Sequence, residues 1–360
     1  MITRAGRTIR LVLIMCLITE FLFCMGMRPG NASQNITDLR SLWEENTGNG
    51  VQDDTAIFQR GLKLAAGGTL YIPKASAAYS VSNLQIPANI HIIFEEGTVV
   101  QANAGLPINK PLFKISRVAN VVIDGNGATF GMLNSQYPSG FAGGTFSITN
   151  SADITLNNIV VTSSGGGDGF YINNVDNVVV SGCSASDCVR NGLTLIGANG
   201  ALIENCVFSQ NSDGIHVEPN GPADLLNGIV FQNSFAENNK SYGVSISLDK
   251  YKTAAARIDV DISFNNITTR NNGSTGLYLA VYNFGCGIGG AVNVNNYTSD
   301  GDKLAINLSN SGLLSPSVVI NKWQIVNPTA YNMNKVNYLD AAWVRDLSGV
   351  ISGKVVFSQF

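Results

Sequence analysis

The sequence predicts an all-β protein whose chain winds into a solenoid of stacked coils. The first observation is a repeated stretch in which a small residue precedes alternating apolar and mostly polar side chains, the period of a half-buried strand. The second is that no helical pattern separates the copies, whose spacings are 23, 22, 29, 33 and 29 residues. A fixed offset with occasional additions is typical of a β-solenoid whose extra residues form loops on one side. The six copies begin at Gly169, Gly192, Gly214, Gly243, Gly276 and Ala305.

A second series of strands lies between these copies. Each member carries Asn or Gly directly before a residue that should point inward, as in Val178–Cys183 and Ala201–Cys206. Asn and Gly tolerate the left-handed backbone that a tight corner needs, and stacked Asn side chains can form a hydrogen-bonded ladder. We therefore expect corners at these positions. The remaining members are Ile229–Ser234, Ile262–Ile267 and Val292–Tyr297.

Composition narrows the class of protein. The chain has 360 residues, of which 13% are charged and 38 are Gly, and its net charge is −3. Low charge with many Gly, Asn, Val and Ile residues is unlike a helical or a disordered protein. The small negative charge gives no reason to expect a nucleic acid as partner.

Residues 1–32 are expected to be an export signal. Three arginines precede an apolar stretch from Leu11 to Phe23, and small residues at 30–32 offer a cleavage site before Ser33. The apolar run is short for a bilayer, and no other segment could span one. We expect a periplasmic or secreted domain, residues 33–360, that has no membrane contact after cleavage.

Four cysteines would remain after cleavage. Cys183 and Cys206 are 23 residues apart and should occupy equivalent inward positions on neighbouring coils. An oxidising compartment permits a disulfide between them, and two buried thiols fit equally well. No Cys and His spacing suggests zinc. The other two are Cys188 and Cys286.

The segment before the coils predicts a cap. Asp54 or Thr55 can begin a short helix that buries Ile57, Phe58 and Leu62. Such a helix would cover the open apolar end of the solenoid, which would otherwise template aggregation. We expect residues 33–75 to form this cap and residues 313–360 to close the far end.

The same segment carries a resemblance to a known family. It reads Gly48-Asn-Gly-Val-Gln-Asp-Asp-Thr and, after the helix, Gly67-Gly-Thr-Leu-Tyr-Ile-Pro. This closely resembles the opening of the pectate lyase/polygalacturonase superfamily, with Asn49 in place of the usual Asp. With the repeats, the resemblance covers most of residues 46–310. It implies a single-stranded right-handed parallel β-helix.

Alternation assigns the outward side chains of the Gly-led strands. Because adjacent coils lie about 4.8 Å apart, these side chains should form one contiguous strip, with the residues before each Gly as a flanking row. Ile196 should also point outward. The strip is Tyr171, Thr194, His216, Ser245 and Tyr278, and the flanking row is Asp168, Asn191, Asp213 and Tyr242.

The strip concentrates ionisable groups around one histidine. His216 lies between Asp213 and Glu218, and Arg190 is one coil away. A His beside a carboxylate can act as a general acid or base near neutral pH, and a nearby cation can stabilise a carboxylate or an enolate-like transition state. His91, which alternates with apolar neighbours near the cap, is expected to be structural.

We expect the catalytic residues to be His216, Arg190, Glu218 and Lys250. Tyrosine rings offer flat faces for sugar rings, and carboxylates can bind sugar hydroxyls. The expected substrate-binding residues are Tyr171, Asp168, Asp213, Asp249, Tyr251 and Tyr278.

The resemblance implies three chemistries. Polygalacturonases share the Asp168-Gly strand, but the Asp-Asp pair that their hydrolysis needs one coil later would fall at Arg190 and Asn191. Mannuronan C5-epimerases share Asp168-Gly-Phe and an Arg-x-Gly 22 residues later, here Arg190-Asn-Gly. Their ionisable coil would fall at 144–149, which holds no ionisable group, so a site displaced to Asp213–Glu218 is our hypothesis.

Pectate-lyase-type enzymes abstract the C5 proton of a uronate with Arg or Lys, often with Ca²⁺. Arg190 or Lys250 could be that base, with Asp168, Asp213 and Glu218 as metal or sugar contacts. Lyases and epimerases share the abstraction of a proton next to a carboxylate. The sequence therefore predicts an exported enzyme that performs this step on an acidic polysaccharide, with Ca²⁺ as an optional cofactor.

Two alternatives stay open. The first is a glycoside hydrolase with an altered carboxylate pair, Asp213 and Glu218. The second is a β-helix that binds glycan without catalysis, as an adhesin does.

Overall fold

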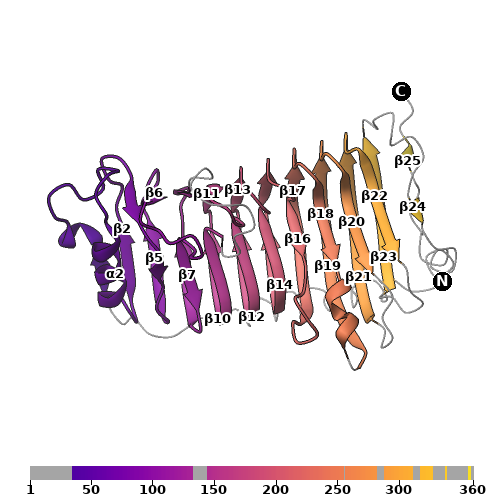
Figure 1. The fold of residues 1–360 in the computed structure, drawn as a ribbon, viewed down its shortest axis with the longest axis horizontal. Coiled ribbons are helices and arrows are strands. Elements are labelled where there is room, and N and C mark those ends of the chain that lie inside the picture. Colours follow the sequence, from indigo (N-terminus) through magenta and orange to yellow (C-terminus); the bar gives the residue numbers. More distant parts are fainter. Residues whose placement is uncertain are drawn as a thin grey trace, which may run out of the picture. The chain divides into compact units, whose positions relative to one another are not determined.

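The strands stack in three parallel columns, and each turn of the chain adds a strand to each column (Figure 1). The structure is a computed structural model that describes residues 35–132, 144–254, 256–281, 288–310, 317–326, 337–338 and 356–357. The proposed export signal, residues 1–32, and Cys286 lie outside this part of the chain. The compact unit that begins at Ile36 contains all the described strands.

The first column, face A, includes the second halves of three long strands, β10 (Phe146–Asn157), β12 (Phe170–Ser181) and β14 (Leu193–Glu204). The other strands of face A are β1 (Ile36–Asp38), β2 (Thr69–Ile72), β5 (Ile90–Phe94), β8 (Ala119–Asp124), β17 (Leu226–Glu237), β19 (Ile258–Arg270), β21 (Ile288–Asp300), β23 (Ser317–Val326) and β25 (Val356–Phe357).

The second column, face B, contains the Gly-led strands and includes the first halves of β10, β12 and β14. Phe170, Leu193 and Ile215 are directly paired in successive coils, and the same register continues through Val244, Leu277 and Ile306. The predicted repeat is thus confirmed. The other strands of face B are β4 (Leu84–Gln85), β7 (Phe113–Ser116), β16 (Ile215–Val217), β18 (Tyr242–Ser247), β20 (Thr275–Val281), β22 (Leu304–Asn310) and β24 (Asn337–Tyr338).

The third column, face C, completes each coil, and the last residues of β17 join it. Its strands are β3 (Tyr79–Val81), β6 (Val99–Ala102), β9 (Thr129–Met132), β11 (Val160–Ser164), β13 (Ser184–Ser186) and β15 (Val207–Ser209). Inward side chains from all three faces fill one apolar core in which like residues stack between coils. Phe113 and Phe146 stack at 4.7 Å between ring centroids, and Phe231 and Phe264 at 4.8 Å.

Two described insertions lengthen the later coils, and both enter at the corner where face B passes to face A. In β10, β12 and β14 the chain turns this corner without leaving its strand. In the next coils, residues 218–225 form a loop after β16, and a 3-10 helix, Asp249–Thr253, follows β18. Both insertions therefore lie next to face B.

The corner between faces A and C is built as predicted. Asn205, Asn233, Asn266 and Asn296 have φ angles of 51–56°, and Gly182 has a φ of 63°. The side chains of Asn233, Asn266 and Asn296 form an exposed ladder, in which Asn266 Nδ2 donates to Asn233 Oδ1 at 2.8 Å and Asn296 Nδ2 donates to Asn266 Oδ1 at 2.9 Å.

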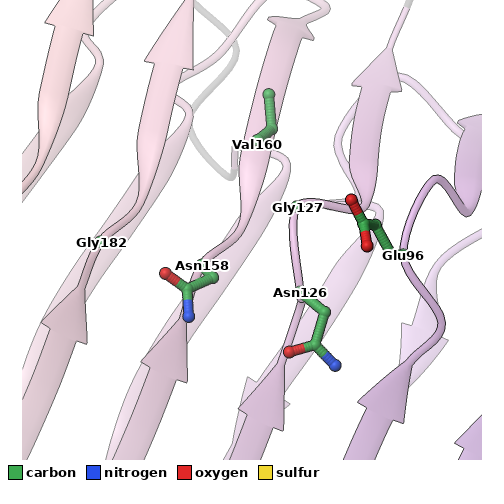
Figure 2. Close-up of a pocket in the computed structure, with 6 residues that line it drawn as sticks. All are labelled: Glu96, Asn126, Gly127, Asn158, Val160 and Gly182. Carbon is green, nitrogen blue, oxygen red and sulfur yellow. The ribbon is translucent and has the colours of Figure 1, made fainter.

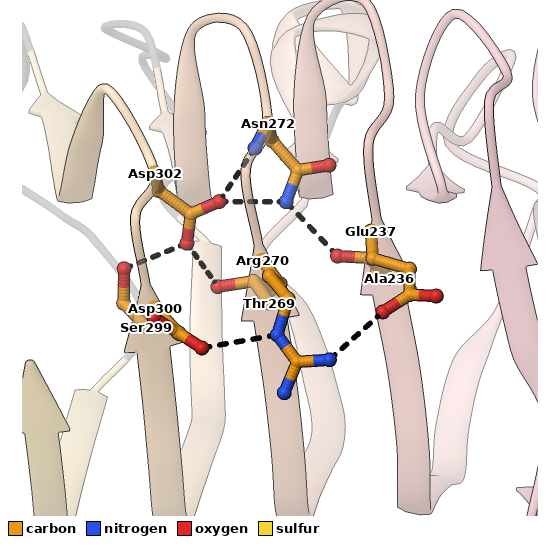
Figure 3. Close-up of polar contacts among 8 residues, drawn as sticks. All are labelled: Ala236, Glu237, Thr269, Arg270, Asn272, Ser299, Asp300 and Asp302. Carbon is orange, nitrogen blue, oxygen red and sulfur yellow. Dashed lines mark hydrogen bonds and ion pairs between the residues drawn. The ribbon is translucent and has the colours of Figure 1, made fainter. Parts of the chain in front are cut away.

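A second ladder is buried inside the coils. The backbone N–H of Asn211 donates to Asn239 Oδ1, the N–H of Asn239 to Asn272 Oδ1, and the N–H of Asn272 to Asp302 Oδ1, each at 2.9–3.0 Å. Figure 3 shows its last step, where Thr269 and Ser299 also donate to Asp302 and Arg270 bridges Glu237 and Asp300 on the surface.

The predicted cap helix is α2 (Thr55–Leu64), and it lies beside the first coils (Figure 1). It buries Ile57, Phe58 and Leu62 as expected. Asp54 is at the N-cap position, but its side chain does not cap the helix. Its carboxylate accepts instead from the N–H groups of Gly48 and Ser80, so it ties the cap to the first coil.

Two further expectations can be compared with the described residues. Cys183, Cys188 and Cys206 are buried free thiols, so the disulfide between Cys183 and Cys206 is absent and the two-thiol alternative holds. Within residues 313–360, β23 continues face A in register with β21. No described helix is long and apolar enough to cross a membrane.

Candidate active site

The outward side chains of face B form the predicted strip. Tyr171 pairs with Thr194, Thr194 with His216, His216 with Ser245, and Ser245 with Tyr278. Thr194 and Ser245 are buried, whereas the other three side chains are half-buried. The strip is thus continuous but more covered than simple alternation predicts.

Ile196 does not point outward from this strip, contrary to the prediction. The register between β12 and β14 shifts after Ile172, so that Asn173 pairs with Gly197. Ile196 occupies this bulge and is buried. The loop 218–225 passes directly over Gly197, where an added Cβ would lie only 3.1–3.2 Å from Asp224. Glycine at this bulge therefore lets the loop close over face B.

His216 is held between two carboxylates. Its Nδ1 lies 3.0 Å from Asp213 Oδ2, and its Nε2 lies 3.6 Å from Glu218 Oε2. Burial lowers the pKa of His216, but the hydrogen bond and charge of Asp213 and the charges of Glu218 and Asp168 outweigh it, so the pKa is raised overall. The site therefore favours a proton on this imidazole.

The three side chains of this trio differ in how far they are exposed. The His216 side chain is 19% exposed, but its Nε2 is covered and has no hydrogen-bond partner within the protein. Glu218 is 30% exposed and Asp213 only 7%. Glu218 is thus the member of this trio most open to a ligand, and Asp213 is the most buried.

Arg190 and Asp168 form a second charged pair beside the first. Arg190 Nε lies 3.8 Å from Asp168 Oδ1, which also accepts from the N–H of Asn191. The Asp168 side chain is fully buried, and burial raises its pKa despite the nearby charge of Arg190. Because 3.8 Å is longer than a hydrogen bond, the half-buried guanidinium keeps bonding capacity for a ligand.

Polar atoms that are buried without a hydrogen-bond partner concentrate on this face. Five such atoms occur among the described residues, and four lie on face B or in its flanking row. Buried polar groups are normally paired, so unpaired ones often mark a functional site. The four are Asp168 Oδ2, Asn173 Oδ1, His216 Nε2 and Asn307 Oδ1.

The aromatic residues divide into two groups. Tyr242 and Tyr278 stack at 4.7 Å between centroids, and both are half-buried, so they form a platform beyond His216. Tyr251, in contrast, was expected to bind sugar but is fully buried, and its hydroxyl donates to the Asp224 carbonyl. The short helix Asp249–Thr253 turns this ring inward, where its hydrogen bond connects the helix to the loop 218–225.

The remaining predicted residues lie on the rim. Asp249 accepts from the Ser247 hydroxyl at 2.9 Å, and Lys250 is exposed on the same 3-10 helix. Tyr171 is half-buried, and its raised pKa results from burial, partly offset by hydrogen bonds with Asn173 and Asn220. The structure therefore brings His216, Glu218, Asp213, Asp168 and Arg190 together, with Tyr171 beside them.

The donor set does not fit a bound metal ion. Within the described part of the chain, no group of three or more His, Cys, Asp or Glu side chains could hold one. The carboxylates proposed for Ca²⁺ are directed at His216 and Arg190 instead.

A separate open depression of about 620 Å³ lies at the corner between faces A and C (Figure 2). Its lining residues are Glu96, Asn126, Gly127, Asn158, Val160 and Gly182.

Comparison with known proteins agrees with this architecture. A family profile described as a right-handed β-helix region matches residues 114–256. Polygalacturonase from Erwinia carotovora ssp. carotovora superposes with a TM-score of 0.61 at 10% identity, over 85% of this chain and 95% of that chain. The fold of this chain is thus a right-handed parallel β-helix.

Other β-helix proteins superpose comparably. The surface adhesin PfbA of Streptococcus pneumoniae gives a TM-score of 0.57 at 13% identity, over 81% of this chain and 86% of that chain. Endo-xylogalacturonan hydrolase from Aspergillus tubingensis gives 0.52 at 13% identity, over 82% and 86%. A search of curated proteins found no match.

The carboxylate pair of the hydrolase alternative, Asp213 and Glu218, has His216 between its two members. An inverting pair of carboxyl groups needs open space for a water molecule between them. Here the imidazole of His216 stands between Asp213 and Glu218, and Asp213 is nearly buried.

Proposed function

We propose that this β-helix acts on a uronate-containing polysaccharide and abstracts the C5 proton of a uronate residue. The observation that carries the proposal is one contiguous cluster with a proton-accepting trio, Asp213, His216 and Glu218, beside the cation Arg190. Proton abstraction next to a carboxylate needs a base and a cation to balance the charge that develops on the carboxylate. Residues 1–32, as an export signal, would bring the enzyme to such polymers outside the cytoplasm.

Arg190 binds the carboxylate of the reacting sugar in this mechanism. As the C5–H bond breaks, its electron pair moves onto that carboxylate, and the guanidinium stabilises the resulting enolate-like group. Asp168 sits beneath Arg190 and orients it.

Glu218 accepts the C5 proton, because it is the exposed member of the trio. The proton then passes to Nε2 of His216, whose proton affinity is increased by Asp213 at Nδ1. A neutral imidazole is needed to receive the proton, so activity should rise as pH increases through the raised pKa of His216. In a lyase, the electron pair then forms a C4–C5 double bond as the C4–O bond breaks, and the departing sugar oxygen takes up a proton from solvent. In an epimerase, a solvent water molecule instead donates a proton to C5 from the opposite face.

Deuterium uptake tests the shared step directly. The protein is incubated with a panel of uronate polymers in D₂O, with Glu218→Gln as the control variant. Uptake of deuterium at C5, or ultraviolet absorbance of an unsaturated uronate, is expected for the wild type and not for the variant. New reducing ends without either signal would instead identify a hydrolase.

A second candidate is glycan binding without turnover. Two observations favour it: the covered Nε2 of His216 and the likeness of the fold to that of the pneumococcal adhesin. Retention of a uronate polymer by the protein, with no deuterium uptake and no new chain ends, would select this function.

A further inference from the structure

A lysine lies on the same outward row as His216, four coils nearer the N-terminus. Lys114 on β7 pairs with Ser147, and Ser147 pairs with Tyr171. The row then continues through Thr194 to His216. Lys114 is half-buried and belongs to face B, as His216 does, and of the three positions between them Tyr171 is half-buried whereas Ser147 and Thr194 are buried.

The distance between Lys114 and His216 can be derived from the spacing of the coils. Four coil spacings of about 4.8 Å place its backbone about 19 Å from that of His216. A sugar residue in an extended polysaccharide advances by a length similar to one coil spacing. A chain that crosses the strands along this row would therefore bring a sugar about four residues away from the reacting one to Lys114.

The surface between Lys114 and Tyr171 has the chemistry that a sugar chain requires. A parallel outward row contains Ser116, Thr149 and Asn173, and the Thr149 hydroxyl donates to Ser116 at 2.9 Å. Asn173 Oδ1 is buried without a partner, although its amide nitrogen contacts the Tyr171 hydroxyl at 3.4 Å. An unpaired acceptor of this kind fits a hydroxyl donor from a ligand.

We propose that this half of face B is a binding track for an anionic polysaccharide, and that Lys114 binds a uronate carboxylate about four sugar residues from the reacting one. The proposal rests on the proposed function, because it takes His216 and Glu218 as the reacting point. It implies that the enzyme distinguishes long uronate chains from short ones.

Oligouronates of increasing length test the track. Affinity is measured by calorimetry on the Glu218→Gln protein, so that no substrate is consumed, with and without Lys114→Met. The control is Lys63→Met, which removes an exposed lysine from α2, outside the strip. For oligomers long enough to reach Lys114, Lys114→Met should weaken binding about fivefold, the size of one exposed charge pair, and this difference should vanish in high salt.

Short oligomers separate this proposal from the proposed function. We expect them to bind equally well to both proteins, and Arg190→Met to weaken oligomers of every length. Equal affinity of Lys114→Met and Lys63→Met for the long oligomers would overturn the track while leaving the proposed reaction in place. Absence of binding of any oligouronate to the parent protein would overturn the proposed function, and the track with it.

Discussion

Faces A and B each present an outward row of polar side chains, yet the two rows differ in how their hydrogen bonds are satisfied. On face A, Asn157 donates to Asp124 at 2.8 Å, and Ser181 and Gln232 both donate to Glu204, at 3.1 and 2.9 Å. On face B, Asn173, His216 and Asn307 each have a buried polar atom without a partner. Among the described residues, face A has one such atom, Thr69 Oγ1, whereas face B and its flanking row have four.

The two histidines of the chain sharpen the contrast. His91 Nε2 lies 2.6 Å from Asp124 on face A, and its side chain is 32% exposed. His216 on face B has an aspartate at a similar distance but also faces Glu218, and it is less exposed. A histidine with an aspartate is therefore not in itself a site. What distinguishes His216 is the second carboxylate and the nearby Arg190.

Replacing the two histidines should produce the largest difference between the faces. His216→Ala is expected to lower the rate of C5 proton abstraction by at least about 100-fold, the usual contribution of a general acid or base. Thermal stability should change little, because the side chain lies outside the core. His91→Ala should keep wild-type turnover. Equal loss of activity in both variants, measured with the same polymer, would contradict the assignment of the site to face B.

Asp213→Asn tests the cause of the raised pKa of His216. Asp213 favours the protonated imidazole, so its neutralisation should lower the pKa of His216. Because the neutral imidazole is the active form, the rising limb of the pH–rate profile should move to lower pH. The maximal rate should fall about tenfold, which is less than the loss expected for His216→Ala. An unshifted limb would show that another group controls it.

Asp168→Asn should separate function from stability. The raised pKa of the buried Asp168 means that its ionised form destabilises the fold near neutral pH. Asn retains an acceptor for the Asn191 N–H, so the variant should gain up to about 1 kcal/mol in unfolding free energy while losing activity. The gain should shrink as pH falls and Asp168 becomes protonated. Denaturant unfolding at pH 7 and pH 4 checks this sign.

Glu204→Ala on face A should have the opposite effect, and the smallest. Two neighbouring coils donate to this carboxylate, so its removal should cost about 0.5–1 kcal/mol. Turnover should stay at the wild-type level, because face A is not the reacting surface. A large loss of activity at unchanged stability would extend the functional surface to face A.

The fold could be predicted because its determinants are local and repeated. The alternation after each Gly fixes which side chains point inward, and the register of Phe170, Leu193 and Ile215 follows from it. The αL corners were equally visible as Asn or Gly before each inward residue. Alternation does not reveal the ladder of Asn211, Asn239 and Asn272, although its signal is an Asn three or four residues before three of the Gly-led strands.

The site was only partly predictable from the sequence. The alternation along a strand predicts which way a side chain points, but it does not predict whether other residues cover that side chain. Alternation located His216 and Glu218, yet it could not show that Nε2 of His216 is covered and that Glu218 is the accessible group. Alternation predicts the wrong environment for Tyr251 and Ile196, because neither lies on a regular strand position. One belongs to a 3-10 helix and the other to a bulge, and both depend on how the inserted loop folds back.

The buried Asn ladder has a direction, and this direction bears on how the chain is made. Each backbone N–H in it is satisfied by a side chain from the following coil, from Cys188 and Asn211 onward to Asp302. A coil that has just left the ribosome or a membrane pore therefore cannot complete its own interior until its successor arrives. Folding of the solenoid should advance one turn behind synthesis or translocation, and a chain truncated between Asn239 and Asp302 would end in a coil with an orphaned amide.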